Sequence, residues 1–328
     1  MATQNIITDT LPAYVEQNRE ELISKVIFRG GTIEKMAKQT GIKTKAALNY
    51  LQTDPTFQDG NGCGFNPQGT AALTQREIST GLIKVNMEFC PDTLLGKWAE
   101  YLVAIRATKD ELPFEQYLIE SIIANINKKM DKAVWQGDTT SSDESLSHFD
   151  GLLKIAAAEA DTVKVAIAAG TSAYDAIKTV YMAIPEQVLD KGARIFVSPA
   201  LFREFTQEMV EKNYYHYSGA QDQNVEEFVF PGTNVRVEST PGLSGTQNIL
   251  ATYTDNMFYG CDAVDDKEEL KLWFSHDADL FRLKVKWNAG TQFAFPDEVV
   301  LGTIATAAAA PATGAPSSTT VPSSSDKK

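Results

Sequence analysis

The chain has 328 residues, of which 43% are hydrophobic and 22% charged, so it is long and apolar enough to bury a substantial core. Its 30 basic and 43 acidic residues give a formal net charge of -13 at pH 7, which argues against a reader of nucleic acid. The three cysteines, Cys63, Cys90 and Cys261, are widely spaced and form no C-x-x-C pair, which argues against a disulfide framework or a zinc site.

The first predicted element is an amphipathic helix at residues 11–28. Its apolar positions repeat with helical spacing before two glycines end it: Leu11, Val15, Leu22, Ile23, Val26 and Ile27. We interpret residues 1–42 as an N-terminal arm. The first residues show no positive region followed by an apolar one, and no run of about 18 apolar residues occurs in the sequence, so we expect neither standard export nor a membrane span.

Residues 43–90 form a polar, extended stretch in two halves. Between them lies the most glycine-rich segment of the chain, DGNGCGFNPQG at 59–69. The second half ends in LIKVNMEFC at 82–90, where apolar and polar residues alternate as in a half-buried strand. The two halves together predict a long β-hairpin with the glycine cluster at its tip.

Two ligand-binding interpretations of this glycine cluster compete with a hairpin tip. Asp59, Asn61 and Gly64 match positions one, three and six of a calcium loop, but the soft thiol of Cys63 and the short Thr70 stand where oxygen ligands are required. A phosphate-binding P-loop needs a lysine where Thr70 follows the last glycine. A tight turn needs only the conformational freedom of glycine, so we favour the hairpin tip.

The next predicted element is a long helix in LPFEQYLIESIIANINKKMDKAVWQGD at 112–138. Apolar residues recur at steps of four, a proline lies in the first turn and Gly137 follows the end. At 1.5 Å per residue this helix spans more than about 30 Å, which is long enough to form the spine of a domain. The segment SHFDGLLKI at 147–155 predicts a loop and a short strand.

Helices and strands alternate from residue 172 onward, which indicates a compact α/β lobe. We expect a helix at 172–190, a buried strand in ARIFVSP and a second helix that opens after Pro199. Strands follow near VRVEST, NILATYT and ELKLWFS, separated by turns at Pro-Gly, Ser-Gly and Tyr-Gly. The alternating segment at 280–302 predicts a β-hairpin with its turn at Asn288–Gly290.

Residues 305–328 are an Ala/Pro/Ser/Thr tail that we expect to be disordered and exclude from the fold. The histidines, His148, His216 and His276, are too far apart in sequence to form a paired motif. No nucleophile elbow, catalytic-cysteine signature or dinucleotide fingerprint occurs. We therefore predict no catalytic, cofactor-binding or metal-binding residues.

The order of these parts resembles the major capsid protein of tailed double-stranded DNA bacteriophages, whose fold encapsulin nanocompartments share. The resemblance covers about residues 10–304. Besides the arm, the hairpin and the spine helix, it rests on four segments: KAVWQGD (132–138), FDGLL (149–153), VSPALFREF (197–205) and WNAGTQFAFPDEVVLG (287–302).

The resemblance implies an α+β phage major-capsid fold. Its parts would be an N-terminal arm (1–42), an extended loop (43–95), a peripheral domain built from two segments (96–165 and 262–304), an axial domain (166–261) and the tail (305–328). The hairpin tip would contact a neighbouring subunit through Asp59, Asn61, Cys63, Phe65, Asn66 and Gln68. The axial domain would make contacts through Tyr214, Tyr215 and Tyr217.

The resemblance also implies a function: a structural protein, not an enzyme, that self-assembles as hexamers and pentamers into an icosahedral shell. The shell would enclose double-stranded DNA without sequence-specific binding, with a portal protein, a separate scaffolding protein and room for decoration proteins. It would be part of the virion and assemble in the host bacterial cytoplasm.

Some members of the family join subunits through isopeptide bonds. Lys43, Lys45 and Lys84 are available in the hairpin segment, but no matching Asn and Glu are identifiable, so we predict no covalent network. Two alternatives to a phage capsid remain open. One is an encapsulin-type shell around a cargo enzyme, and the other is a soluble α/β enzyme that uses residues 166–261.

Overall fold

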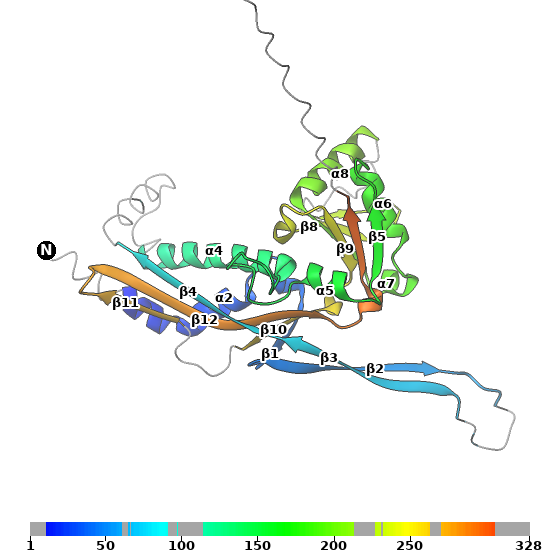
Figure 1. Cartoon of the computed structure of the whole chain (residues 1–328), viewed down its shortest axis with the longest axis horizontal. Helices are drawn as coiled ribbons and strands as arrows, with labels where there is room; N and C mark the ends of the chain where they lie inside the picture. Colours follow the sequence, from blue (N-terminus) through cyan, green and yellow to red (C-terminus); the bar gives the residue numbers. More distant parts are fainter. Residues whose placement is uncertain are drawn as a thin grey trace, which may run out of the picture.

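The structure is a computed structural model, and it describes residues 11–60, 65, 67–90, 97, 114–212, 227–230, 232–262 and 270–305. Two sheets and a projecting hairpin organise this part of the chain (Figure 1). The five-stranded sheet contains β1 (Ala37–Thr40), β10 (Met257–Asp262), β12 (Leu280–Phe293), β11 (Leu270–Ser275) and β4 (Gly81–Phe89). The six-stranded sheet contains β5 (Val163–Ile167), β13 (Val300–Ile304), β9 (Asn248–Thr252), β6 (Arg194–Val197), β8 (Arg236–Ser239) and β7 (Glu227–Val229). The hairpin pairs β2 (Lys45–Pro55) with β3 (Gly69–Ser79).

The helices follow the sheets in two groups. The five-stranded sheet carries α2 (Arg19–Phe28), α4 (Phe114–Gln136) and α5 (Leu152–Ala158). The six-stranded sheet carries α6 (Ala173–Met182), α7 (Glu186–Asp190) and α8 (Pro199–Glu211). Short 3-10 turns are η1 (Ile33–Lys35), η3 (Pro241–Leu243), η4 (Thr254–Asn256) and η5 (Pro296–Glu298).

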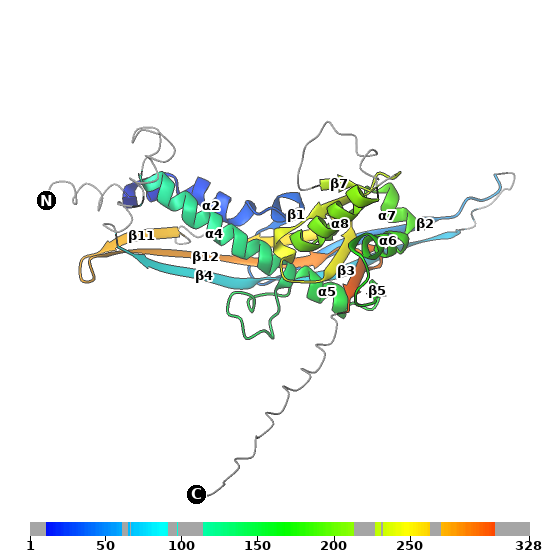
Figure 2. The ribbon, with the colours of Figure 1, turned by 90° about the horizontal axis from the view of Figure 1, so that it is seen from above.

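The spine helix α4 confirms the prediction made from its periodicity. The residues at steps of four are buried: Phe114, Leu118, Ile122, Ile126, Met130 and Val134. They share one core with α2 and with the buried side of β12, and Figure 2 shows α2 and α4 together on one side of the sheet. The predicted start of α8 is also confirmed, because Pro199 opens the helix and the Ser198 hydroxyl accepts a hydrogen bond from the Leu201 amide.

The predicted hairpin at 280–302 is wrong. Strand β12 runs without interruption through Asn288–Gly290, and the following strand β13 belongs to the other sheet. Gly290 is present because another backbone crosses there: a Cβ at this position would lie 2.1 Å from the Ser79 carbonyl oxygen. This glycine therefore marks a close approach of two chain segments and not a turn.

Three further elements differ from their predictions. FDGLL leads into helix α5, since a short apolar run fits a helix as well as a strand. The helix expected at 172–190 divides into α6 and α7, because Pro185 cannot continue a helix. Tyr259–Gly260 lies inside β10 and not in a turn; a Cβ on Gly260 would meet the side chain of Ile78 at 2.8 Å.

The strands also cross the boundaries of the expected segments. The second half of the 43–90 stretch divides, because β3 pairs with β2 whereas β4 leaves the hairpin and pairs with β12. Residues 257–262 of the expected axial segment lie in the five-stranded sheet, and residues 300–304 of the expected peripheral segment lie in the six-stranded sheet. The predicted tail from residue 306 onward lies outside the described residues.

Candidate assembly surfaces

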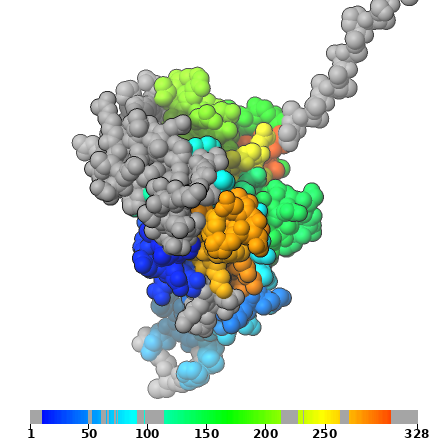
Figure 3. All heavy atoms as spheres, turned by 90° about the vertical axis from the view of Figure 1, so that its left-hand side faces the viewer, coloured from blue at the N-terminus to red at the C-terminus, as the bar shows by residue number. Residues whose placement is uncertain are grey.

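The hairpin β2–β3 is the most prominent projection of the described chain. Its strands pair from Lys45↔Ser79 to Pro55↔Gly69, a length of about 35 Å for 11 residues. In Figures 1 and 2 it extends away from both sheets, and in Figure 3 it emerges below the body. Its base is anchored by a small apolar cluster in which Ile42, Leu48 and Ile78 pack with Phe258.

The outer part of the hairpin exposes large apolar side chains. Phe57 is 98% exposed, Phe65 is 93% exposed and Leu73 is 70% exposed. A two-stranded hairpin is only marginally stable in water without a further surface to pack on. Exposed apolar groups on a projecting element are typical of a surface that binds another molecule.

The predicted contact residues fall into two groups. Asp59, Phe65 and Gln68 lie exposed on the outer part of the hairpin. The other predicted contacts lie outside the described residues: Asn61, Cys63, Asn66, Tyr214, Tyr215 and Tyr217. Cys90 is half-buried and Cys261 is buried.

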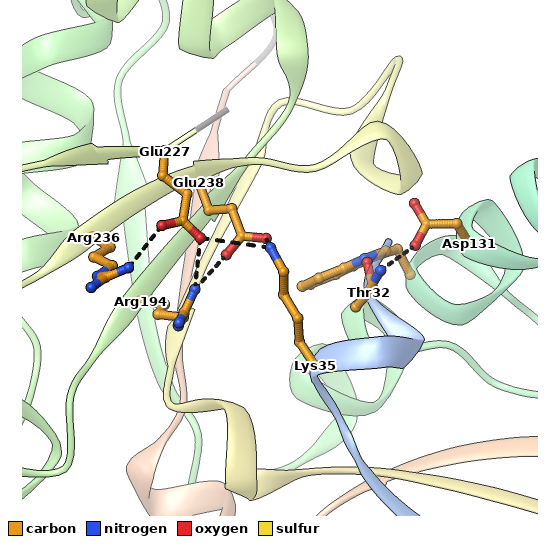
Figure 4. A network of polar contacts seen from close by, with 8 residues as sticks. Thr32, Lys35, Asp131, Arg194, Glu227, Arg236 and Glu238 are labelled. Carbon is orange, nitrogen blue, oxygen red and sulfur yellow. Dashed lines mark hydrogen bonds and ion pairs between the residues drawn. The ribbon is translucent and has the colours of Figure 1, made fainter. Parts of the chain in front are cut away.

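An ion network joins the N-terminal segment to the six-stranded sheet (Figure 4). Glu238 is 4% exposed and receives Lys35 from η1 together with Arg194, whose guanidinium lies 3.0 Å from one carboxylate oxygen. Arg194 also contacts Glu227 at 3.1 Å, and Arg236 contacts Glu227 at 2.9 Å. Burial raises the pKa of Glu227, but the hydrogen bond from Arg236 and the charges of Arg194 and Lys35 outweigh it, so the pKa is lowered.

A second set of contacts fixes the end of the spine helix. The buried carboxylate of Asp131 accepts a hydrogen bond from the Thr32 amide at 3.0 Å, and the Trp135 indole donates to the Thr32 hydroxyl at 2.7 Å. Gln136 donates to the carbonyl of Gly242 at 2.6 Å. The helix end thus contacts both the N-terminal segment and η3. No sequence pattern predicted these contacts, because their partners lie about 100 residues apart in the chain.

The described residues offer little for catalysis or ligand binding. They contain no group of three or more His, Cys, Asp or Glu side chains placed to hold a metal ion. A shallow depression of about 370 Å³ lies on α8, and Arg203 is the one titratable side chain among the residues that line it. Within the same part of the chain, no helix is both long and apolar enough to cross a bilayer.

No family model matches the sequence, and no curated protein matches it. In structure, the chain is similar to one described as "Satellite phage P4 procapsid including size determination (Sid) protein", with 14% identity over 88% of this chain and 91% of that chain and a TM-score of 0.58. It is also similar to a chain of Microbacterium phage Oxtober96, with 14% identity, coverage of 84% and 91%, and a TM-score of 0.51. A third similar chain is described as "Capsid of empty GTA particle computed with C5 symmetry". It has 12% identity over 86% of this chain and 90% of that chain, and a TM-score of 0.50.

The chain has the fold of the phage major capsid proteins. This confirms the α+β fold class predicted from the order of segments. In this capsid fold, the ion network and the Asp131–Thr32 contact hold the two sheets and the spine helix in one arrangement, from which the hairpin projects. The division into peripheral and axial domains remains a prediction.

Proposed function

We propose that the chain is the major capsid protein of a tailed bacteriophage and assembles as hexamers and pentamers into a closed icosahedral shell around double-stranded DNA. The observation that carries this proposal is the capsid fold itself, which spans 88% of the chain in the P4 procapsid comparison. The exposed Phe57 and Phe65 on the projecting hairpin support it, since they suit an element that packs on a neighbouring subunit.

The charge of the chain constrains how such a shell is held together. A net charge of -13 on every copy produces long-range repulsion between subunits. Association must therefore come from apolar burial, strand pairing and local charge complementarity. The same charge suits a wall that encloses DNA without recognising its sequence.

The proposal includes roles and partners for the predicted segments. The hairpin tip, with Asp59, Asn61, Cys63, Phe65, Asn66 and Gln68, would contact a neighbour, and Tyr214, Tyr215 and Tyr217 would lie near the five-fold and six-fold axes. A portal protein, a separate scaffolding protein and decoration proteins would complete the virion, and assembly would take place in the bacterial cytoplasm. The chain itself would be a structural protein without enzymatic activity.

Electron microscopy of the purified full-length chain tests this function. We expect rings or closed shells. As a control, a variant in which residues 51–73 are replaced by an Asn-Gly turn retains Leu48 and Ile78 at the hairpin base, so it should fold but remain unassembled. A chain that stays monomeric at high concentration would contradict a capsid and favour the soluble enzyme. Shells that hold a cargo protein, without a portal or DNA, would instead indicate an encapsulin.

A further inference from the structure

Strand β3 turns one side toward the body at the point where the hairpin leaves it. Arg76 and Ile78 are two residues apart and therefore point to the same side of the strand. Ile78 is fully buried, and the side chain of Arg76 is 16% exposed. Thr70, on the same side near the outer end of β3, is exposed. The contact between this side of β3 and the body therefore ends between residues 70 and 76.

Arg76 extends from the hairpin to an acidic residue of the body. Its guanidinium forms an ion pair with Glu159, which directly follows helix α5. Figures 1 and 2 both show α5 near the base of the hairpin. The chain then enters the six-stranded sheet, where β5 begins at Val163. This ion pair therefore joins the hairpin to the segment that leads into the six-stranded sheet.

The environment of Arg76 makes Glu159 important. Among the described residues, Glu159 is the one carboxylate that pairs with Arg76. In the same part of the chain, the buried Nε of Arg76 makes no hydrogen bond. Loss of the Glu159 charge would leave a largely buried guanidinium without a counter-charge, which is unfavourable.

A residue of the five-stranded sheet completes the contact. The side-chain oxygen of Gln292, on β12, lies 3.4 Å from Nη2 of Arg76. The side-chain amide of Gln292 donates to the backbone carbonyl of Glu77 at 2.9 Å. The Phe293 amide donates to the same Gln292 oxygen at 3.0 Å, which orients the side chain. Arg76 thus lies where the hairpin meets segments of both sheets.

The base of the hairpin therefore has two kinds of attachment. The apolar cluster of Ile42, Leu48 and Ile78 holds it by burial, which does not depend on direction. The ion pair between Arg76 and Glu159 is a charge-assisted hydrogen bond, which requires a defined distance and direction. The cluster can keep the hairpin attached at several angles, whereas the ion pair favours one.

The position of Arg76 makes small shifts large at the outer end. At about 3.3 Å per residue, Arg76 lies about 10 Å from Ser79 at the base, and Gly69 lies about 33 Å from it. A rotation about the base that moves Arg76 by about 2 Å would therefore move Gly69 by about 7 Å. An ion pair at Arg76 is close enough to the base to be made by the body and far enough out to control the angle.

We propose that Arg76 is a positioning residue: through its ion pair with Glu159 it fixes the angle at which the hairpin leaves the body, and thereby restricts assembly to one shell size. The inference rests on the proposed function, because only an assembled shell has a size. The angle itself is a property of the single chain.

A distance measured within one full-length chain tests the angle. Spin labels are placed on Thr70→Cys at the outer end of β3 and on Lys178→Cys, an exposed site on α6. Cys63→Ser and Cys90→Ser leave the buried Cys261 as the one native thiol. Labelled chains are diluted among unlabelled ones, so that pulsed electron paramagnetic resonance reports distances within a chain.

We expect one narrow distance distribution for the unaltered ion pair. Arg76→Gln and Glu159→Gln each keep a side chain of hydrogen-bonding length but remove one charge of the pair. Each should broaden the distribution by about 7 Å, the displacement that a shift of about 2 Å at Arg76 produces. The exchange variant, Arg76→Glu with Glu159→Arg, restores opposite charges and should recover most of the narrow distribution.

Lys45→Gln is the matched control. Lys45 pairs with Glu77 at 3.1 Å across the hairpin itself, and both side chains are more than half exposed. This substitution removes one positive charge from the hairpin base, as Arg76→Gln does, but breaks no contact with the body. Its distance distribution should equal that of the unaltered chain, and circular dichroism confirms that every variant is folded.

Electron microscopy of assembled particles tests the consequence for the shell. We expect one diameter for the unaltered chain and for Lys45→Gln, and two or more diameters for Arg76→Gln and Glu159→Gln. The exchange variant should return mainly to the single diameter. Lower stability alone would reduce the yield of shells without producing new sizes.

The two measurements separate the possible failures. Narrow distributions in both single variants would overturn the proposal, whatever their shells look like. Broad distributions with shells of one unchanged diameter would refute the control of shell size. If the unaltered chain forms no shells, the proposed function fails and the size effect with it, while broad distributions would still show that Arg76 holds the hairpin.

Discussion

Gly290 shows how a single residue determines the path of the chain. Strand β12 passes through it, and the backbone of Ser79 and Thr80, where β3 ends and β4 is about to begin, lies against it. Gly81, at the start of β4, lies in an equally narrow position, because a Cβ there would lie 1.8 Å from the His148 carbonyl oxygen. Both glycines allow backbones to approach, which is the use of glycine that a strand interior permits.

Gly290→Ala should therefore destabilise the protein by about 3 kcal/mol, the upper end of the range for overpacking. The added methyl group would meet the Ser79 backbone, which cannot rotate away as a side chain can. Thermal or denaturant unfolding of the variant measures the loss.

Gly31→Ala is the matched control for this substitution. No atom lies within 4 Å of its added Cβ, so its free energy of unfolding should change by no more than about 0.5 kcal/mol. Equal effects of the two substitutions would show that the close crossing at Gly290 is not what requires a glycine.

For single residues such as Gly290, the sequence pattern led to a wrong prediction for a physical reason. The Asn288–Gly290 stretch predicts a turn, since local chemistry makes glycine common in turns. The actual requirement comes from Ser79, which is more than 200 residues away in the chain. The ion network was missed for the same reason, because Lys35 and Glu238 meet only in the folded chain.

Among the elements, the hairpin divides into an anchored base and an exposed outer part. Leu48 at the base is 5% exposed and belongs to the small cluster with Ile42 and Ile78, whereas Leu73 further out is 70% exposed. The same residue type thus has two environments in one hairpin. The base fixes the direction of the hairpin, and the outer part is available to a partner.

Leucine-to-alanine substitutions separate these two roles. Leu48→Ala should cost about 2 kcal/mol of unfolding free energy, at the lower end for a buried leucine because the cluster is small. Leu73→Ala should leave stability within about 0.5 kcal/mol but slow assembly. Unfolding and light scattering on both variants test this, and a Leu73→Ala chain with reduced stability and normal assembly would contradict it.

Elements with strong local signals were predicted well. The spine helix α4 was predicted because its apolar residues recur at steps of four, and α8 because Pro199 marks its start. Short elements were predicted poorly. The segment FDGLL fits a helix or a strand equally well until its packing partners are known. Which sheet a strand joins was not predictable either, as β4, β10 and β13 show.

For the whole molecule, the order of segments predicted the capsid fold better than any single motif did. The fold-level resemblance depends on the arm, hairpin, spine helix and central lobe appearing in sequence, and that order does not change when an individual boundary is misplaced. The candidate contact surfaces were predicted only in part. The hairpin was identified from its glycine-rich tip, whereas the departure of β4 from the hairpin required the strand register.

Assembly should depend on salt because every copy carries a net charge of -13. Raising the ionic strength from 0.01 M to 0.1 M shortens the Debye length from about 30 Å to about 10 Å, which screens long-range repulsion between copies. We expect subunits to assemble faster at 0.1 M, as light scattering would measure. Faster assembly in the lowest salt would show that repulsion between copies is not limiting.

A single residue, Thr80, separates β3 in the hairpin from β4 in the five-stranded sheet. With no flexible linker between them, the hairpin cannot swing freely while the sheet stays rigid. A closed container places identical subunits at positions of unequal curvature. In the proposed shell, the adjustment would come from a change in strand twist that tilts the hairpin, so that the hairpin angle of each subunit follows the local curvature.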